Sequence, residues 1–291
     1  MNKNKTYPFY FVVAALILYV VLFLLPSIVG LLYSFTDWNS YSDAINFVGF
    51  KNFKDILFSA NDQYLSYIKN TLVFTVSSVA IKTLLALALA LLFTNGIRMT
   101  NFHRTVAFCP QVISYLIIGL VFKGILHPTT GFLNNTLRAF GLGGLAKDWL
   151  GNIKYAFGSV IGVDAWKGVG FGMVIFIAGI QAIPTVYYEA ASIDGAGFFK
   201  KLIKITIPFL IPTVVINIIL SLTYGLRVFD AVYVLTNGGP GYATDVINTA
   251  VFRFFSTGNY AMGNALSSIL SMFTILISYF IIKALNRKVD Y

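Results

Sequence analysis

The feature that most constrains the fold is an uncharged run of 31 residues, 6–36. A helix needs about 20 apolar residues to cross the roughly 30 Å hydrocarbon core of a bilayer. A cleavable signal peptide has an apolar region of only about 7–15 residues, followed by a small-residue cleavage site. This run is longer and has no such site, so we expect it to remain in the membrane as a helix.

The composition of the whole chain also indicates an integral membrane protein. Of the 291 residues, 57% are hydrophobic and 11% are charged, whereas soluble globular domains have about 25% charged residues. We therefore predict an all-α membrane protein with one transmembrane domain over residues 1–291. Six stretches are apolar enough to cross the bilayer as helices. They are approximately residues 9–32, 72–93, 105–122, 157–183, 205–226 and 262–282.

The distribution of Lys and Arg predicts the orientation of these six spans. Six spans place both termini on one side, where four segments carry ten Lys and Arg in 49 residues; the three segments on the other side carry eight in 100. Cytoplasmic loops collect Lys and Arg, so both termini are expected in the cytoplasm. This explains the net charge of +10 without nucleic acid. The cytoplasmic segments are 1–8, 94–104, 184–204 and 283–291, and the outer segments are 36–70, 123–154 and 229–261.

Other functional classes leave little trace in the sequence. Cys109 is the only cysteine, and His103 and His127 are far apart in the chain, so neither a cysteine metal site nor the convergent residues of a membrane enzyme can be recognised. An ion-coupled secondary transporter is the main alternative. Such proteins often use acidic residues inside their spans, and here only Asp164, near the predicted start of the fourth span, qualifies.

The cytoplasmic loop 184–204 is predicted to fold as a helix, a turn and a second helix. Residues 185–193 can form about two helical turns, and Asp194-Gly195 then breaks the helix because glycine adopts left-handed angles without strain. The second helix is expected to start after Gly197 and to enter the fifth span, with its lysines at the lipid headgroups. Those lysines are Lys200, Lys201 and Lys204.

The same loop presents a surface that a partner can approach closely. Its small residues are Ala190, Ala191, Gly195, Ala196 and Gly197. Glu189 is the only glutamate in the chain, and its carboxylate can pair with an Arg or Lys of a partner. The alternative is an interfacial helix with a belt of lysines and no partner.

The segment EAASIDGAGFFKKLIKITIP, residues 189–208, resembles the EAA loop of binding-protein-dependent ABC importers. The family pattern is E-A-A, three residues, Gly, nine residues and I-x-L-P. Here Gly195 stands at the required distance from Glu189, and Ile207 replaces the usual leucine. The resemblance implies that a coupling helix docks on an ATPase subunit. The residues that it assigns to this surface are Glu189, Ala190, Ala191, Asp194, Gly195 and Ala196.

Motifs along the rest of the chain are similar to the first permease subunit of maltose and glycerol-phosphate importers. They are SFTDW at 34–38, FVGFKNF at 47–53, GFLN at 131–134, WKGVGF at 166–171 and VLTNGGP at 234–240. The resemblance implies a type I ABC importer permease in a bacterial cell membrane, with the coupling helix between the fourth and fifth spans. It also implies import of a carbohydrate.

The partners implied by this family are other protein chains. They are a second permease that forms a heterodimer, two ATP-binding subunits and an external sugar-binding protein. This chain has no G-x-x-x-x-G-K-[ST] sequence for cradling phosphates. It is therefore expected to bind no cofactor itself, while ATP and Mg²⁺ are bound by the partner ATPase.

Polar residues at helical spacing suggest a substrate path. Residues spaced by four, four and three fall on one face of the fifth span, and amide and hydroxyl groups suit a sugar, on whose apolar face a tyrosine ring can stack. The alternative is helix–helix contact, which Ser and Thr often make in membranes. The candidates in the fifth span are Thr213, Asn217, Ser221 and Tyr224, and those in the sixth are Asn264, Ser268, Ser271 and Ser278.

The remaining unusual residues in the spans are charged residues and glycines. Lys82 is expected either to face the protein interior or a wet cavity, or to extend to the lipid headgroups. Asp164 and Lys167 are three apart, so they are predicted to pair on one helix face in a structural role. Small-residue spacing predicts close helix packing at two glycine pairs. These are Gly158 with Gly162 and Gly168 with Gly172.

Overall fold

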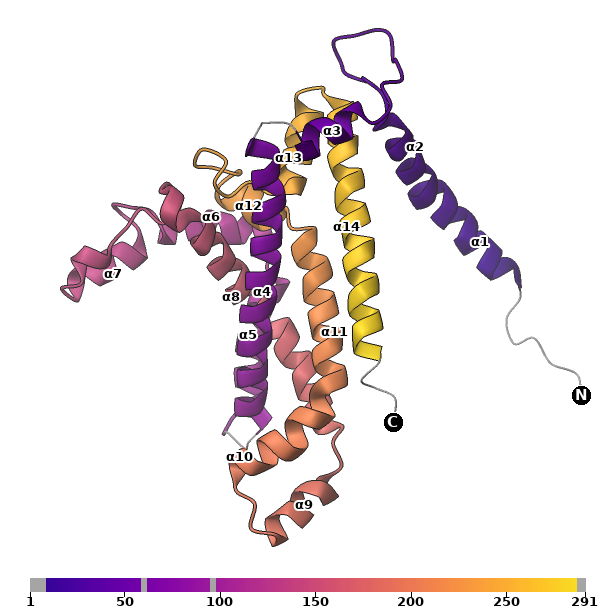
Figure 1. Cartoon of the computed structure of the whole chain (residues 1–291). Coiled ribbons are helices and arrows are strands. Elements are labelled where there is room, and N and C mark those ends of the chain that lie inside the picture. Colours follow the sequence, from indigo (N-terminus) through magenta and orange to yellow (C-terminus); the bar gives the residue numbers. More distant parts are fainter. Residues whose placement is uncertain (1–8, 59–61, 95–97, 287–291) are drawn as a thin grey trace, which may run out of the picture. The chain divides into compact units, whose positions relative to one another are not determined.

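The computed structural model describes residues 9–58, 62–94 and 98–286, and these residues are mostly helical (Figure 1). The predicted cytoplasmic termini, 1–8 and 283–291, lie outside the described residues except for 283–286. The α-helices are α1 Phe9–Tyr19, α2 Leu25–Tyr33, α3 Lys51–Phe58, α4 Asp62–Thr94, α5 Thr100–Val112, α6 Tyr115–Ile125, α7 Phe132–Ala139, α8 Ile153–Gln181, α9 Thr185–Ile193, α10 Phe198–Lys201, α11 Ile207–Leu226, α12 Asp230–Leu235, α13 Ile247–Ser256 and α14 Tyr260–Asn286. Shorter π and 3₁₀ segments are η1 Val20–Leu24, η2 Gly143–Leu145 and η3 Leu202–Thr206.

Five helical stretches in the described residues are long and apolar enough to cross a membrane, and a bent pair of helices supplies a sixth if it counts as one span. This agrees with the predicted all-α, six-span class. The second is longer than predicted, because the 33 residues of α4 extend about 50 Å at 1.5 Å per residue. The five stretches are Val12–Tyr33, Gln63–Thr94, Ile153–Gln181, Phe198–Leu226 and Tyr260–Phe280.

The predicted third span, residues 105–122, is not one straight helix in the structure. Instead, α5 and α6 meet at an angle of 99°. The helix ends because Ile113 adopts an extended conformation, and α6 restarts at Ser114, whose side chain accepts a hydrogen bond from Ile117 N–H. Pro110 in the last turn of α5 removes one backbone donor and weakens the helix there.

The chain divides into two compact units, of which the first contains residues 1–64 and 250–272. In this unit, two of the sequence motifs form one structure after α2. The amide of Val48 donates to Phe35 O at 2.8 Å. The side-chain amide of Asn52 donates to the backbone oxygens of Ser34 and Thr36, both at 2.8 Å. These bonds hold the SFTDW and FVGFKNF segments together as one folded loop.

The second unit contains residues 65–249 and 273–291, and its central element is α8. This helix contacts α5, α11 and α12. Its apolar side chains are buried in two clusters, one with Phe74 of α4 and Val232 of α12, the other with Ala86 and Phe93 of α4. A charged or polar group on the buried face of α8 is therefore removed from lipid and from water, and it requires partners from the neighbouring helices.

Only one of the two predicted glycine pairs on α8 marks a close approach. A Cβ at Gly168 would lie 2.7 Å from Lys82 Cε, and a Cβ at Gly172 would lie 2.9 Å from Ala86 Cβ. Lys82 and Ala86 both belong to α4. A Cβ at Gly158 or Gly162 would meet no atom of the described chain within 4 Å. The close-packing prediction is thus confirmed for Gly168 and Gly172, where a larger residue would push α4 away from α8.

Candidate functional site

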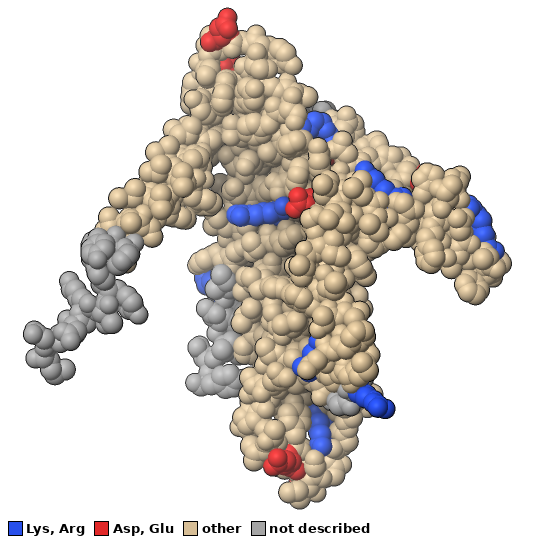
Figure 2. Space-filling view, turned by 180° about the vertical axis from the view of Figure 1, so that it is seen from behind, with Lys and Arg blue, Asp and Glu red and all other residues tan. Residues whose placement is uncertain are grey.

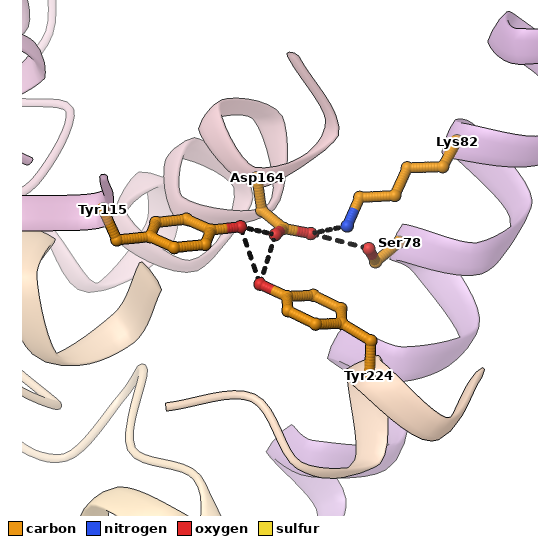
Figure 3. Close-up of polar contacts among 5 residues, drawn as sticks. All are labelled: Ser78, Lys82, Tyr115, Asp164 and Tyr224. Carbon is orange, nitrogen blue, oxygen red and sulfur yellow. Dashed lines mark hydrogen bonds and ion pairs between the residues drawn. The ribbon is translucent and has the colours of Figure 1, made fainter. Parts of the chain in front are cut away.

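A buried acid on α8 gathers side chains from three other helices (Figure 3). Asp164 Oδ2 pairs with Lys82 Nζ at 2.6 Å and accepts a hydrogen bond from Ser78 Oγ at 2.7 Å, both from α4. Asp164 Oδ1 accepts from the hydroxyls of Tyr115 on α6, at 2.6 Å, and Tyr224 on α11, at 2.8 Å. We call these five residues the Asp164 cluster.

The Asp164 cluster compensates the burial of its charged groups. The Asp164 residue is 0% exposed and Lys82 is 7% exposed, and an isolated charge at such positions would be very costly. Each carboxylate oxygen of Asp164 has two donors, so its acceptor capacity is filled. Lys82 Nζ also lies 4.4 Å from the ring centroid of Tyr224, in a cation–π contact. The cluster thus joins α4, α6, α8 and α11 at one point.

The structure decides where Lys82 lies and corrects the predicted partner of Asp164. Lys82 faces the protein interior, which was one of its two predicted positions. Asp164 pairs with Lys82 rather than with Lys167, because Lys167 Nζ reaches the end of α5 instead. There it donates to Gln111 O at 2.8 Å and to Pro110 O at 3.4 Å. A cation is favourable at the carbonyls that a helix C-terminus leaves free, so Lys167 stabilises the break between α5 and α6.

A pocket of about 170 Å³ lies beside the Asp164 cluster. It combines hydroxyl, amide and ammonium groups with aromatic faces, which suits a small polyhydroxylated ligand. Its lining residues are Lys82, Gln111, Tyr115, Lys167, Gly168, Phe171, Leu220, Ser221 and Tyr224. Within the described residues, no group of three or more His, Cys, Asp or Glu is placed to hold a metal ion.

The structure separates the predicted path residues of α11. Ser221 and Tyr224 line the pocket. Asn217 is 2% exposed and donates to Thr83 Oγ1 of α4 at 3.1 Å. Thr213 lies against Gly179 of α8. Asn217 and Thr213 therefore make the helix–helix contacts that were the alternative interpretation.

The candidates of the sixth span are not among the residues that line the pocket. Asn264 and Ser268 belong to the first unit, on α14. The side chain of Asn264 donates to Tyr260 O, one turn earlier in its own helix, at 3.0 Å. It also packs close to Gly30, because a Cβ added at Gly30 would lie 3.0 Å from Asn264 Oδ1. Their assignment to the substrate path remains a prediction.

On helices other than α11, sequence reasoning gave no packing, pairing or path role to three pocket residues. Gln111 and Tyr115 flank the break between α5 and α6, and Phe171 is on α8. No helical periodicity connects them with α11, because they come from different helices. Opposite charges inside the spans were the one usable signal, since such charges usually pair with one another. That signal would have linked Lys82 with Asp164.

The predicted coupling loop folds as expected. Helix α9 occupies Thr185–Ile193, and Gly195 has a left-handed φ of +70°. The amide of Gly195 donates to Ser192 O at 3.1 Å, and that of Ala196 donates to Ala191 O at 2.8 Å. These two bonds form a Schellman motif, which satisfies the free carbonyls at the end of α9. Gly197 then precedes the helix that begins at Phe198.

Side-chain contacts fix α9 against the next helix. Lys201 Nζ donates to Ser192 Oγ at 2.6 Å, and the hydroxyls of Tyr188 and Thr206 are 2.9 Å apart. Lys201 therefore binds the loop itself, and the position of the three lysines at the lipid headgroups stays a prediction. These contacts make the loop a preformed unit whose position follows that of η3 and α11.

The exposed face of the loop carries an acid that has no partner among the described residues. Glu189, Ala190, Asp194 and Gly195 are exposed. Among the described residues, no hydrogen bond or ion pair holds the Glu189 carboxylate. Figure 2 shows acidic side chains at the lower end of the view, where α9 lies, with basic side chains above them. Ile193, 87% exposed, adds a large apolar side chain to this surface.

Comparison with known proteins agrees with this architecture. Residues 71–291 match the family model described as "Binding-protein-dependent transport system inner membrane component". The chain is 32% identical to the probable ABC transporter permease protein YurN of Bacillus subtilis, with 96% of this chain and 95% of that protein covered. It is 31% identical to the multiple sugar-binding transport system permease protein MsmF of Streptococcus mutans, with 99% and 97% covered.

A solved structure resembles the chain over nearly its whole length. It is the crystal structure of a bacterial ABC transporter involved in the import of the acidic polysaccharide alginate. One of its chains superposes with a TM-score of 0.85 at 25% identity, covering 97% of this chain and 96% of that one. The chain therefore belongs to the family of inner membrane components of binding-protein-dependent transport systems, and it is an ABC transporter permease rather than an ion-coupled secondary transporter or an enzyme.

Proposed function

We propose that this chain forms one half of the membrane path of an ATP-driven sugar importer, and that α9 couples it to a separate ATPase. The observation that carries the proposal is the preformed α9 loop with Glu189 on its exposed face, where no described residue pairs with the carboxylate. Small residues beside Glu189 let a partner backbone approach closely, and an Arg or Lys of the ATPase would pair with the carboxylate. The surplus of Lys and Arg in the same segments supports a cytoplasmic position for α9 and both termini.

The connections of α9 provide a route from the ATPase to the pocket. Along the chain, α9 follows α8 and precedes the helical stretch that ends in α11. From the end of α8 at Gln181 back to Asp164, the helix runs for about 26 Å at 1.5 Å per residue. On the other side, the Tyr188–Thr206 contact ties α9 to the start of α11, which carries Tyr224. A displacement of α9 thus moves two of the four helices that meet at the Asp164 cluster.

The pocket beside the Asp164 cluster is proposed to contact the sugar during alternating access. Ser221 and Gln111 provide hydrogen-bonding groups, and the rings of Phe171 and Tyr224 provide apolar faces. The similarity to a permease of a multiple sugar transport system and to an alginate importer supports a carbohydrate substrate. The pocket has a volume of about 170 Å³, which is below the roughly 300–1,000 Å³ of pockets for drug-sized ligands. It therefore suits one sugar ring.

The proposed assembly contains this chain, a second permease, two ATP-binding subunits and an external sugar-binding protein. The family is binding-protein-dependent by description, which supports the last of these. ATP and Mg²⁺ are assigned to the ATPase subunits, because this sequence has no phosphate-binding loop.

Uptake by the reconstituted importer is expected to require ATP on the side of the membrane that α9 faces. The test is uptake of labelled sugar into vesicles that contain the purified complex and its binding protein, with ATP, with a non-hydrolysable analogue or with neither. Ionophores that collapse proton and Na⁺ gradients provide the control and should leave ATP-driven uptake unchanged. Uptake that follows an ion gradient without ATP would contradict the proposal.

A further inference from the structure

The pocket beside the Asp164 cluster has an excess of positive charge. Two lysines, Lys82 and Lys167, are among its lining residues, and no acid among the described residues lines it. Asp164 is 0% exposed, pairs with Lys82 and is not among the lining residues. Asp230 also acts on Lys167 through space, but Asp230 is exposed and lies outside the lining. A ligand in the pocket therefore meets ammonium groups and no carboxylate.

The two lysines differ in how their charge is compensated. Lys82 is neutralised by its 2.6 Å ion pair with Asp164. Lys167 forms no ion pair within the described residues and contacts uncharged groups, the backbone oxygens of Gln111 and Pro110 and the ring of Tyr115, whose centroid is 4.9 Å from Nζ. Asp164 and Asp230 act on its charge only through space. Lys82, Lys167 and Asp164 together carry one net positive charge, and the exposed Asp230, whose charge water screens, offsets it only in part. Lys167 is 6% exposed, so bulk water screens this charge little and an anion would gain strongly from it.

We infer that the pocket selects a sugar that carries an anionic group, and that Lys167 is the residue that determines this preference. The inference rests on the proposed function of the pocket as a sugar contact. An ammonium group has three donors, and Lys167 uses at most two of them on the end of α5. The third is available for a carboxylate or phosphate oxygen of the substrate, in a charge-assisted hydrogen bond.

A purely structural role for Lys167 predicts a different result. If Lys167 only stabilises the end of α5, its replacement would weaken the binding of acidic and neutral sugars by the same factor. If it also contacts the substrate, the ratio of the two affinities changes. The ratio is therefore the informative quantity, and Lys167→Gln is the informative variant because it keeps a donor for Gln111 O while it removes the charge.

The experiment measures equilibrium binding of four labelled sugars to the purified complex without its binding protein. Galacturonate carries a carboxylate, glucose 6-phosphate carries a phosphate, and galactose and glucose are their neutral counterparts. The wild-type complex is expected to prefer at least one acidic probe. Lys167→Gln should weaken that probe about ten- to a hundredfold, as for the loss of one hydrogen bond to a charged group, with little effect on neutral probes. The control, Lys154→Gln, removes an exposed lysine of the same helix and should change neither.

The identity of the bound probe distinguishes a carboxylate from a phosphate substrate. Equal or tighter binding of the neutral probes, the absence of binding of both acidic probes, or an unchanged ratio in Lys167→Gln would overturn the inference. The ATP dependence of uptake is measured separately, so a preference for neutral sugars in an importer that still needs ATP would leave the proposed function intact.

Discussion

Replacement of Gly195 by proline is expected to reduce ATP-driven uptake to background while the chain still inserts in the membrane. Gly195 has a φ of +70°, whereas proline fixes φ near −65°. Proline also lacks the N–H that donates to Ser192 O. The Schellman motif at the end of α9 cannot form, so the docking surface loses its shape. The helices of the spans are unchanged, because the turn lies outside them.

Uptake and expression should be measured together on matched variants. Gly197→Ala is the control, because Gly197 has a negative φ of −72° and a Cβ there meets no described atom within 4 Å. It should transport like the wild type. Gly195→Ala should lie between the two, since a left-handed alanine costs only about 1–2 kcal/mol. Normal transport by Gly195→Pro would show that the shape of this turn is not needed for coupling.

Replacement of Lys82 by methionine is expected to destabilise the folded protein by about 3–5 kcal/mol, the usual effect of removing one partner from a buried ion pair. The substitution leaves the Asp164 carboxylate 0% exposed with hydroxyl donors but without a cation. The four helices that meet at the Asp164 cluster then lose their strongest common contact. Thermal unfolding of the purified protein in detergent measures this effect.

A second substitution tests whether the buried charge causes the loss. The double variant Lys82→Met/Asp164→Asn removes both charges and should recover most of the stability. Lys154→Met, at an exposed position of α8, should unfold at the wild-type temperature. If the double variant is as unstable as Lys82→Met alone, the Asp164 cluster does not depend on charge pairing, and its central position in this account is wrong.

The parts of the fold that the sequence predicted are those governed by local chemistry. Hydropathy locates the spans because each needs a sufficient length of apolar residues. The bounds of α9 and the left-handed Gly195 follow from residues within one turn of each other, since only glycine adopts such angles without strain. These features require no knowledge of which helices are neighbours.

The parts that sequence reasoning missed depend on the arrangement of helices in space. The i, i+3 spacing suggested that Asp164 would pair with Lys167, but Lys82 approaches it because Gly168 lets α4 lie close to α8. The break before Ser114 interrupts a run that hydropathy alone treats as continuous. Asn217 shares a helix face with Ser221, yet it faces another helix and not the pocket.

The most direct test of the account is whether Glu189 holds an ATPase on α9. The chain is purified from its native membrane as wild type, as Glu189→Lys and as Asp43→Lys, which reverses an exposed acid elsewhere, and bound proteins are identified by mass spectrometry. We predict that a phosphate-binding-loop ATPase accompanies the wild type and Asp43→Lys, and that Glu189→Lys loses it. A chain that purifies alone and still transports sugar into ATP-free vesicles would contradict the account.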